Sequence, residues 1–400
     1  MPAIEAVRGR LVLDSRGDRT VEIDLLAAGH WGRCAAPSGA STGSHEVRAW
    51  APGGPEASLR LLSRVEATLL GADATDQEGI DARLHAADGT ADFSVLGGNL
   101  AVAVSLANAR AAAASAGKPL YAYLGGPRGM PRPQGNVIGG GAHAVGGTSI
   151  QEFLSTATAG DIAAAAFANA RVHRRVRDHL RKLLPGTPLG KGDEAAWVAP
   201  IADAKALEIV AAACAEITAE TGVDCRPSLD VAATELWKEG RYAYRETTRT
   251  TEEQIAFLEA LAGEHGLVSI EDPLQEEDFA GFAELTRRLG KKCLIVGDDL
   301  FATSVERLRR GISEGSANAV LVKPNQRGTL TDTRATVDLA HRSGYRTVMS
   351  HRSGETTDDA IAHLAVAFGC WGIKTGAAGG ERTAKLNELI RIEEQGKHGS

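Results

Sequence analysis

The stretch VSIEDPLQEEDFAGFAELTRRLGKKCLIVGDD, residues 268–299, decides the fold. It holds two short apolar runs typical of buried strands, the first ending at Glu271 and the second at Asp298. A strand, a loop, a helix and a return loop together take roughly 25 to 35 residues. The separation of 27 residues between the two carboxylates therefore predicts one βα unit.

The same pattern extends outward in both directions. Strand-like runs also end at Asp230, Lys323, His351 and Lys374. In a (β/α)8 barrel the carboxyl ends of the strands share one rim, and active sites are built there. We therefore expect three carboxylates, two lysines and the cluster 351–353 to converge on one pocket, as a metal site combined with acid and base groups.

The first third of the chain predicts a smaller α+β domain. We expect strands at 7–13, 20–27 and 30–36, helices at 56–70, 79–87 and 101–116, and a lid formed by the small-residue loop 37–43. The Gly- and Pro-rich segment 127–150 is expected to connect the domains, and long helices are expected at 161–184 and 204–221. The predicted fold class is α/β, with an N-terminal α+β capping domain over 1–126 and a modified (β/α)8 barrel over 127–400.

Composition excludes several classes of partner. The net charge of −7 argues against nucleic acid and against an anionic membrane, whereas a small anionic substrate remains compatible with clustered lysines and bound metal. The five cysteines are odd in number and have no CxxC spacing, so reduced thiols and a cytoplasmic location are expected. Neither a signal peptide nor an apolar stretch long enough to span a membrane is recognisable.

Nine short motifs in order resemble the signatures of the enolase family over nearly the whole chain. They are LDSRG (13–17), PSGASTG (37–43), QEF (151–153), GDE (192–194), LDVA (229–232), SIEDP (269–273), GDDL (297–300), SHRSGE (350–355) and KTG (374–376). The resemblance implies a small cap on a modified barrel, and a lyase that removes water from a phosphoglycerate-like acid. It also implies a homodimer or a higher homo-oligomer.

The resemblance implies a role for each residue type. Asp230, Glu271 and Asp298 would bind Mg²⁺ through hard oxygen ligands, and Ser41 of the lid would help hold a second Mg²⁺. Lys323 would be the base; because an ordinary lysine has a pKa near ~10.4, burial and nearby positive charge must keep it neutral. Structural ion pairing of the two lysines is the alternative.

The remaining implied roles concern the acid and the substrate. Glu194 would be the general acid, with Glu152 beside it so that one of the two carboxyl groups keeps its proton. His143 would lie at the pocket edge, with a merely packed histidine as the alternative. The residues implied in substrate binding are Gly39, Ser41, His351, Arg352, Ser353 and Lys374.

Several segments depart from the usual family pattern. They are Gln134-Gly135, Gly139–Gly141, Ala195-Ala196 with one extra residue, and Gly379-Gly380. Alanine disfavours positive φ, so the loop that carries Glu194 is expected to follow a different path. We interpret the changes as a reshaped pocket, and the hypothesis we favour is a paralogue that converts 2-phosphonoformylglycerate to carboxyphosphonoenolpyruvate in phosphonate natural-product biosynthesis. The alternatives are phosphopyruvate hydratase of glycolysis and a non-catalytic enolase-like binding protein.

Overall fold

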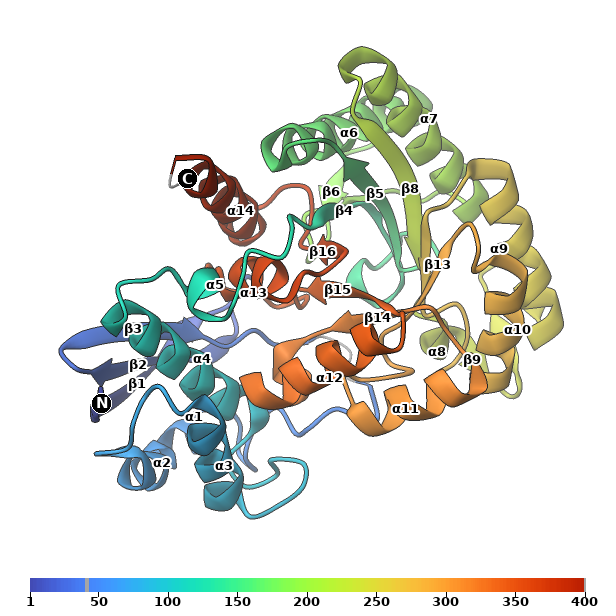
Figure 1. Ribbon diagram of the computed structural model, residues 1–400. Helices are drawn as coiled ribbons and strands as arrows, with labels where there is room; N and C mark the ends of the chain where they lie inside the picture. Colours follow the sequence, from blue (N-terminus) through green and yellow to red (C-terminus); the bar gives the residue numbers. More distant parts are fainter. Residues whose placement is uncertain (40–42, 399–400) are drawn as a thin grey trace.

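The computed structural model describes residues 1–39 and 43–398 and consists of an α+β part followed by a barrel (Figure 1). The α+β part contains β1 (Ile4–Leu13), β2 (Arg19–Ala27), β3 (His30–Ala35), α1 (Pro55–Arg60), α2 (Leu62–Leu69), α3 (Gln77–Asp88), α4 (Gly98–Ser115) and α5 (Leu120–Tyr123). The three strands form an antiparallel meander in the order β1-β2-β3. The helix expected over 56–70 is thus two helices, because Leu61 ends α1 and precedes α2.

The Ala-rich helix α4 packs directly on this sheet, and Gly32 permits the contact. A Cβ atom at Gly32 would lie 2.0 Å from the Ala107 carbonyl oxygen and 2.4 Å from the Ala111 nitrogen. Only a residue without a side chain lets strand and helix backbones approach so closely.

The barrel is a closed ring of eight strands. They are β4 (Arg132–Gly139), β5 (Glu152–Thr158), β8 (Asp224–Asp230), β12 (Ser269–Glu271), β13 (Leu294–Gly297), β14 (Ala319–Val322), β15 (Arg346–Ser350) and β16 (Gly372–Lys374). They pair in that order, and β16 pairs with β4 to close the ring. All pairs are parallel except those of β5, which runs antiparallel to β4 and to β8. The predicted fold class, a cap domain followed by a modified barrel, is confirmed.

Helices surround the barrel (Figure 1). They are α6 (Ile162–Leu183), α7 (Asp203–Thr221), α9 (Thr251–His265), α10 (Phe279–Leu289), α11 (Val305–Glu314), α12 (Leu330–Arg342), α13 (Ala360–Phe368) and α14 (Gly380–His398). Local capping sets several of their starts: the Asp161 side chain accepts a hydrogen bond from Ala164 N at the start of α6, and Thr250 and Glu253 form a capping box on α9.

Short strands and helical turns lie in the loops between these elements. They are β6 (Gly190–Lys191), β7 (Trp197–Val198), α8 (Ala233–Leu236), β9 (Trp237–Lys238), β10 (Arg241–Ala243), β11 (Thr248–Arg249) and the 3₁₀ turns Gly141–His143 and Pro324–Gln326. The expectation that 127–150 is only a connection is wrong, because β4 lies within it. Seven of the eight β4 residues are buried, and the ladders to β5 and β16 satisfy its backbone despite Pro133 and Gly135.

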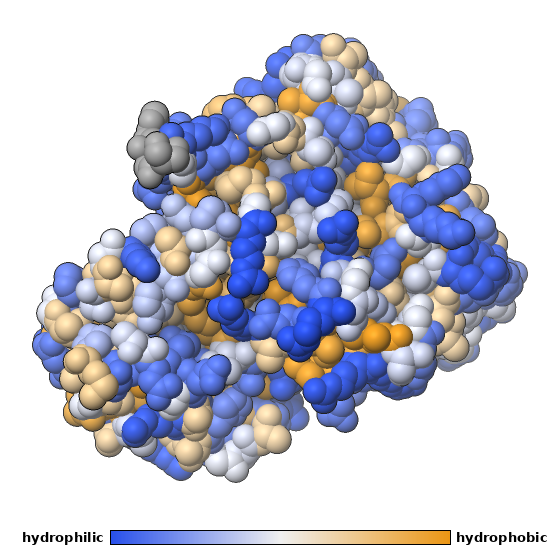
Figure 2. Space-filling view, viewed as in Figure 1, coloured by the Kyte–Doolittle hydropathy of each residue, from blue (hydrophilic) through white to orange (hydrophobic). Residues whose placement is uncertain are grey.

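The α+β part is joined to the barrel through a half-buried arginine. Arg110 of α4 donates hydrogen bonds to both oxygens of Asp358 and forms an ion pair with Asp359, just before α13. Hydrophilic residues spread over both parts of the chain on the face seen in Figure 2, with apolar residues showing between them. Among the described residues, no helix is long and apolar enough to cross a membrane.

Candidate active site

One rim of the barrel gathers the side chains at the strand ends. Asp230, Glu271 and Lys374 are the last residues of their strands, and Asp298, Lys323 and His351 directly follow theirs. Because β5 runs in the opposite direction, its first residue lies at the same rim. Glu152 is thus paired in register with Asp230, which in turn pairs with Glu271. One pocket is lined by all of these except Glu271, together with Gly39, His143, Glu194, Arg352 and Ser353.

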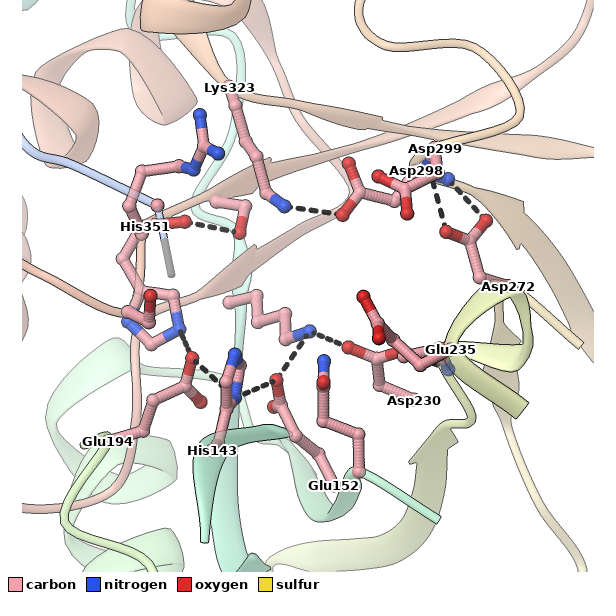
Figure 3. Close-up of a pocket in the computed structure, with 17 residues that line it drawn as sticks. His143, Glu152, Glu194, Asp230, Glu235, Asp272, Asp298, Asp299, Lys323 and His351 are labelled. Carbon is pink, nitrogen blue, oxygen red and sulfur yellow. Dashed lines mark hydrogen bonds and ion pairs between the residues drawn. The ribbon is translucent and has the colours of Figure 1, made fainter. Parts of the chain in front are cut away.

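The pocket has two chemically distinct ends (Figure 3). His143, Glu152, Glu194 and His351 gather at one end, and Asp272, Asp298 and Asp299 gather at the other. The predicted lid residue Ser41 lies outside the described residues, so its expected roles stay predictions.

Lys374 lies between the two ends and is 3% exposed. Its Nζ is 2.7 Å from Asp230 Oδ2, 2.9 Å from Glu271 Oε1 and 3.2 Å from Glu152 Oε1. Burial disfavours the ammonium form, but these carboxylates outweigh that effect and raise the pKa of Lys374 well above its usual value. Lys374 is therefore a cation in this structure.

Lys323 forms an ion pair with Asp298. Burial lowers the pKa of Lys323, but the carboxylates of Asp298, Glu271 and Glu46 together outweigh this effect, and the net direction is upward. This differs from the expectation of a neutral lysine, because that expectation placed positive charges beside it and overlooked the directly bonded carboxylate. Arg352 does act in the expected direction and lowers the pKa of Lys323.

Glu152, Glu194 and His143 form a compact cluster. One carboxylate oxygen of each glutamate and one nitrogen of His143 lie within 4.8 Å of one another. Burial, followed by the charge of Glu194, raises the pKa of Glu152 well above its usual value. Burial also acts to raise the pKa of Glu194, but contacts with His351 and His143 outweigh it and hold that pKa low. The two shifts therefore run in opposite directions, and they favour Glu152 over Glu194 as the holder of a proton.

Arg352 is buried and lies beside the pocket. It pairs with Glu46, at 2.8 Å from Nη1 to Oε2 and 3.1 Å from Nη2 to Oε1, and also donates to Asn325 Oδ1. Glu46 follows the predicted lid, and its Oε1 also accepts a hydrogen bond from Gly43 N. The segment after the lid is thus tied to Arg352, which the family resemblance implies in substrate binding.

The donor set fits a divalent cation. Asp230, Glu271 and Asp298 are all at least 93% buried, and Asp272, Asp298 and Asp299 each place an oxygen within 4.8 Å of the others. Burial, followed by the charge of Asp230, raises the pKa of Glu271 well above its usual value. Oxygen-only ligands of this kind suit Mg²⁺.

Sequence reasoning missed several lining residues. They are Gln151, Glu235, Asp272 and Asp299, to which Glu46 is added by its contact with Arg352. Asp272 and Asp299 each directly follow a predicted metal ligand in the sequence, and that position could have indicated that they line the pocket. Glu235 on α8 has no such signal, because only the tertiary fold turns that short helix toward the pocket.

Two of the segments that depart from the family pattern differ from expectation. A Cβ atom at Gly135 would lie 2.9 Å from the nitrogen of Ala377, so the loop after β16 occupies the space beside Gly135, which was interpreted as part of a reshaped pocket. Ala195 adopts φ of 59° although it is not glycine. His173 Nε2 is 2.9 Å from the Ala195 carbonyl oxygen, and its ring stacks on Trp197 at 5.0 Å. These contacts hold the strained residue in place.

Comparison with known proteins assigns the family. Residues 4–124 match the model described as "Enolase, N-terminal domain", and residues 128–399 match "Enolase, C-terminal TIM barrel domain". The chain belongs to the enolase family. It is 53% identical to an enolase of Halobacterium salinarum over 99% of this chain and all of that protein. It is also 52% identical to an enolase of Methanocorpusculum labreanum over 98% of this chain and all of that protein.

Membership in the enolase family makes this protein a hydro-lyase. An enolase of Methanothermobacter thermautotrophicus is likewise 53% identical, over 98% of this chain and 96% of that protein. These full-length relatives give no support to the specialised phosphonate paralogue favoured from the loop departures, and they favour the alternative, enolase itself. The packing at Gly135 removes part of the reason for the phosphonate hypothesis.

Proposed function

We propose that this protein is a phosphopyruvate hydratase, which eliminates water from 2-phosphoglycerate to form phosphoenolpyruvate. The observation that carries the proposal is the convergence of Lys323, Lys374, Glu152 and Glu194 on one pocket beside a surplus of buried carboxylates. This set can remove a proton at one carbon and protonate a leaving hydroxyl at the next.

Lys323 is the proposed base for the C2 proton. It lines the pocket beside Asp298; burial and Arg352 favour the neutral amine, and the Asp298 carboxylate opposes it. Glu194 is the proposed acid for the C3 hydroxyl, with Glu152 holding the proton that the pair shares. Since His143 lies 3.6 Å from Glu152 and 3.7 Å from Glu194, it is placed to relay a proton between them.

The remaining residues bind and orient the substrate. Lys374 would hold the substrate carboxylate, and Arg352 and Ser353 would hold the phosphoryl group, with His351 and Gly39 at the pocket wall. Asp230, Glu271 and Asp298 would hold one Mg²⁺, and Ser41 would contribute to a second. When bound, Mg²⁺ would stabilise the negative charge that develops on the substrate carboxylate.

The proposal is tested by ³¹P NMR of the purified protein with Mg²⁺ and 2-phosphoglycerate, with 2-phosphonoformylglycerate as the matched comparison substrate. Rapid formation of phosphoenolpyruvate and slow turnover of the comparison substrate are expected. The reverse preference would overturn the proposal. A cytoplasmic location, domain limits at 1–126 and 127–400, and assembly as a homodimer or higher homo-oligomer stay predictions.

A further inference from the structure

Arg382 lies near the start of α14 and is fully buried. Its guanidinium contacts two segments that carry proposed site residues. Nη2 donates to the carbonyl oxygen of Asp193 at 3.1 Å and to that of Ser353 at 2.8 Å. Nη1 donates to the carbonyl oxygen of Arg352 at 2.7 Å. Arg382 therefore ties the loop before Glu194 to the segment after β15.

Nη1 of Arg382 also lies 2.7 Å from Nδ1 of His351. A guanidinium carries only N–H donors and has no acceptor. This contact is therefore a hydrogen bond only if Nδ1 of His351 presents its lone pair. The proton of the neutral imidazole then resides on Nε2.

The other side of the His351 ring faces the proposed acid. Nε2 lies 3.4 Å from Glu194 Oε1, and His351 is 2% exposed. Burial lowers the pKa of His351 to about 3; the Glu194 carboxylate opposes this shift and Arg382 adds to it. The contact between Nδ1 and a guanidinium, which can only donate, agrees with a neutral ring. A neutral ring has one proton, and its position decides whether the ring offers Glu194 a donor or a lone pair.

We propose that Arg382 is a positioning residue that fixes the proton of His351 on Nε2 and holds the Glu194 loop against the phosphoryl-binding segment. The Nε2–H then points toward the Glu194 carboxylate. Without Arg382, either nitrogen can carry the proton, and a lone pair on Nε2 would repel Glu194. The catalytic part of this inference rests on the proposed function, whereas the proton position does not.

The proton position is measured directly on the full-length protein. Long-range ¹H–¹⁵N NMR of histidine-labelled protein distinguishes a protonated ring nitrogen from a bare one, and His351→Gln identifies the His351 signals by their loss. The wild type should show a bare Nδ1 and a protonated Nε2. A proton on Nδ1 in the wild type would overturn the proposal even if no Arg382 variant folds.

Two variants then test the link to the reaction. Arg382→Met removes every donor and should give a mixture of ring forms, whereas Arg382→Lys keeps one donor and should retain the Nε2 proton while loosening the loop. Because misplacement of a catalytic group by about 1 Å can cost about 10²-fold, phosphoenolpyruvate formation should fall about 10²-fold in Arg382→Lys. Exchange of the C2 proton with solvent deuterium, which depends on Lys323, should stay near the wild-type rate.

The matched control is Arg287→Met. Arg287 lies on α10 with a side chain that is 71% exposed, so neither the His351 signals nor the exchange-to-elimination ratio should change. The positioning role would be refuted if Arg382→Met left the His351 ring in its wild-type form. It would also be refuted if Arg382→Lys lowered the rates of C2 proton exchange and of water elimination equally. If the wild type does not act on 2-phosphoglycerate, the proposed function fails, and the NMR result still decides the Arg382–His351 contact.

Discussion

Loss of the Lys374 charge should strongly destabilise this protein. Its ammonium lies 2.7 to 3.2 Å from three buried carboxylates, those of Asp230, Glu271 and Glu152. Lys374→Met keeps most of the side-chain volume and removes the cation. Breaking a buried ion pair by removing one partner typically costs about 3–5 kcal/mol. That is a large part of the total stability of about 5–15 kcal/mol that is typical of a protein.

The pH dependence follows from the direction of the pKa shifts. The pKa of Lys374 is raised on folding, so its contribution is present in full below the unfolded pKa and is lost as pH rises through the folded pKa. In Lys374→Met the unpaired carboxylates can instead take up protons in the folded state. The stability difference between wild type and variant should therefore narrow as pH falls from about 8 to about 5.

Urea unfolding followed by circular dichroism, in EDTA and then in Mg²⁺, measures both effects. Mg²⁺ should narrow the difference in unfolding free energy between wild type and Lys374→Met, because the ion would neutralise Asp230 and Glu271. The control is Lys205→Met: Nζ of Lys205 lies 2.7 Å from Glu208, but the two side chains are 40% and 61% exposed, so the change should stay below about 1 kcal/mol. A loss below about 1 kcal/mol for Lys374→Met in EDTA at neutral pH would refute the argument.

Three other substitutions test the site and the fold. Lys323→Ala should lower the rate of C2 proton exchange by about 10²–10⁴-fold while Mg²⁺ binding persists. Deuterium exchange followed by NMR measures this rate. Exchange at the wild-type rate would show that Lys323 is not the base. Asp298→Asn should weaken Mg²⁺ binding in calorimetric titration, and an unchanged affinity would exclude it from the ligand set. Gly135→Val should overpack against Ala377, which lowers the thermal midpoint and costs about 1–3 kcal/mol of folding stability. A midpoint equal to that of the wild type would mean that the loop after β16 moves away without cost.

Much of the barrel rim could be predicted, because each strand end is indicated by residues that are neighbours in the sequence. Each of the six later strands is a short run that ends on a polar residue or directly precedes one, and their spacing admits one helix between neighbours. Asp230, Glu271 and Lys374 end strands as predicted, and Lys374 contacts both carboxylates. Local hydrophobic pattern and connection length were sufficient there.

The first two barrel strands were not predictable in the same way. β4 contains Gln134 and Gly135 and lacks alternation, so its strand character comes from the ladders to β5 and β16, which are distant in sequence. The direction of β5 has no local signature either, although it alone places Glu152 at the rim beside Asp230. Likewise, an alanine by itself disfavours the positive φ that Ala195 adopts. The contact with His173 of α6 stabilises this conformation.

The sequence by itself determined the α/β class, the six strand ends and the family motifs, because these depend on residues that are near one another along the chain. Only the tertiary structure decided the protonation pattern of the pocket. The pKa of Glu152 is raised whereas that of Glu194 is lowered, and Lys323 pairs with Asp298 whereas Lys374 contacts three carboxylates. The physical reason is that a pKa depends on burial and on charges a few ångströms away in space, and strand register and packing set both.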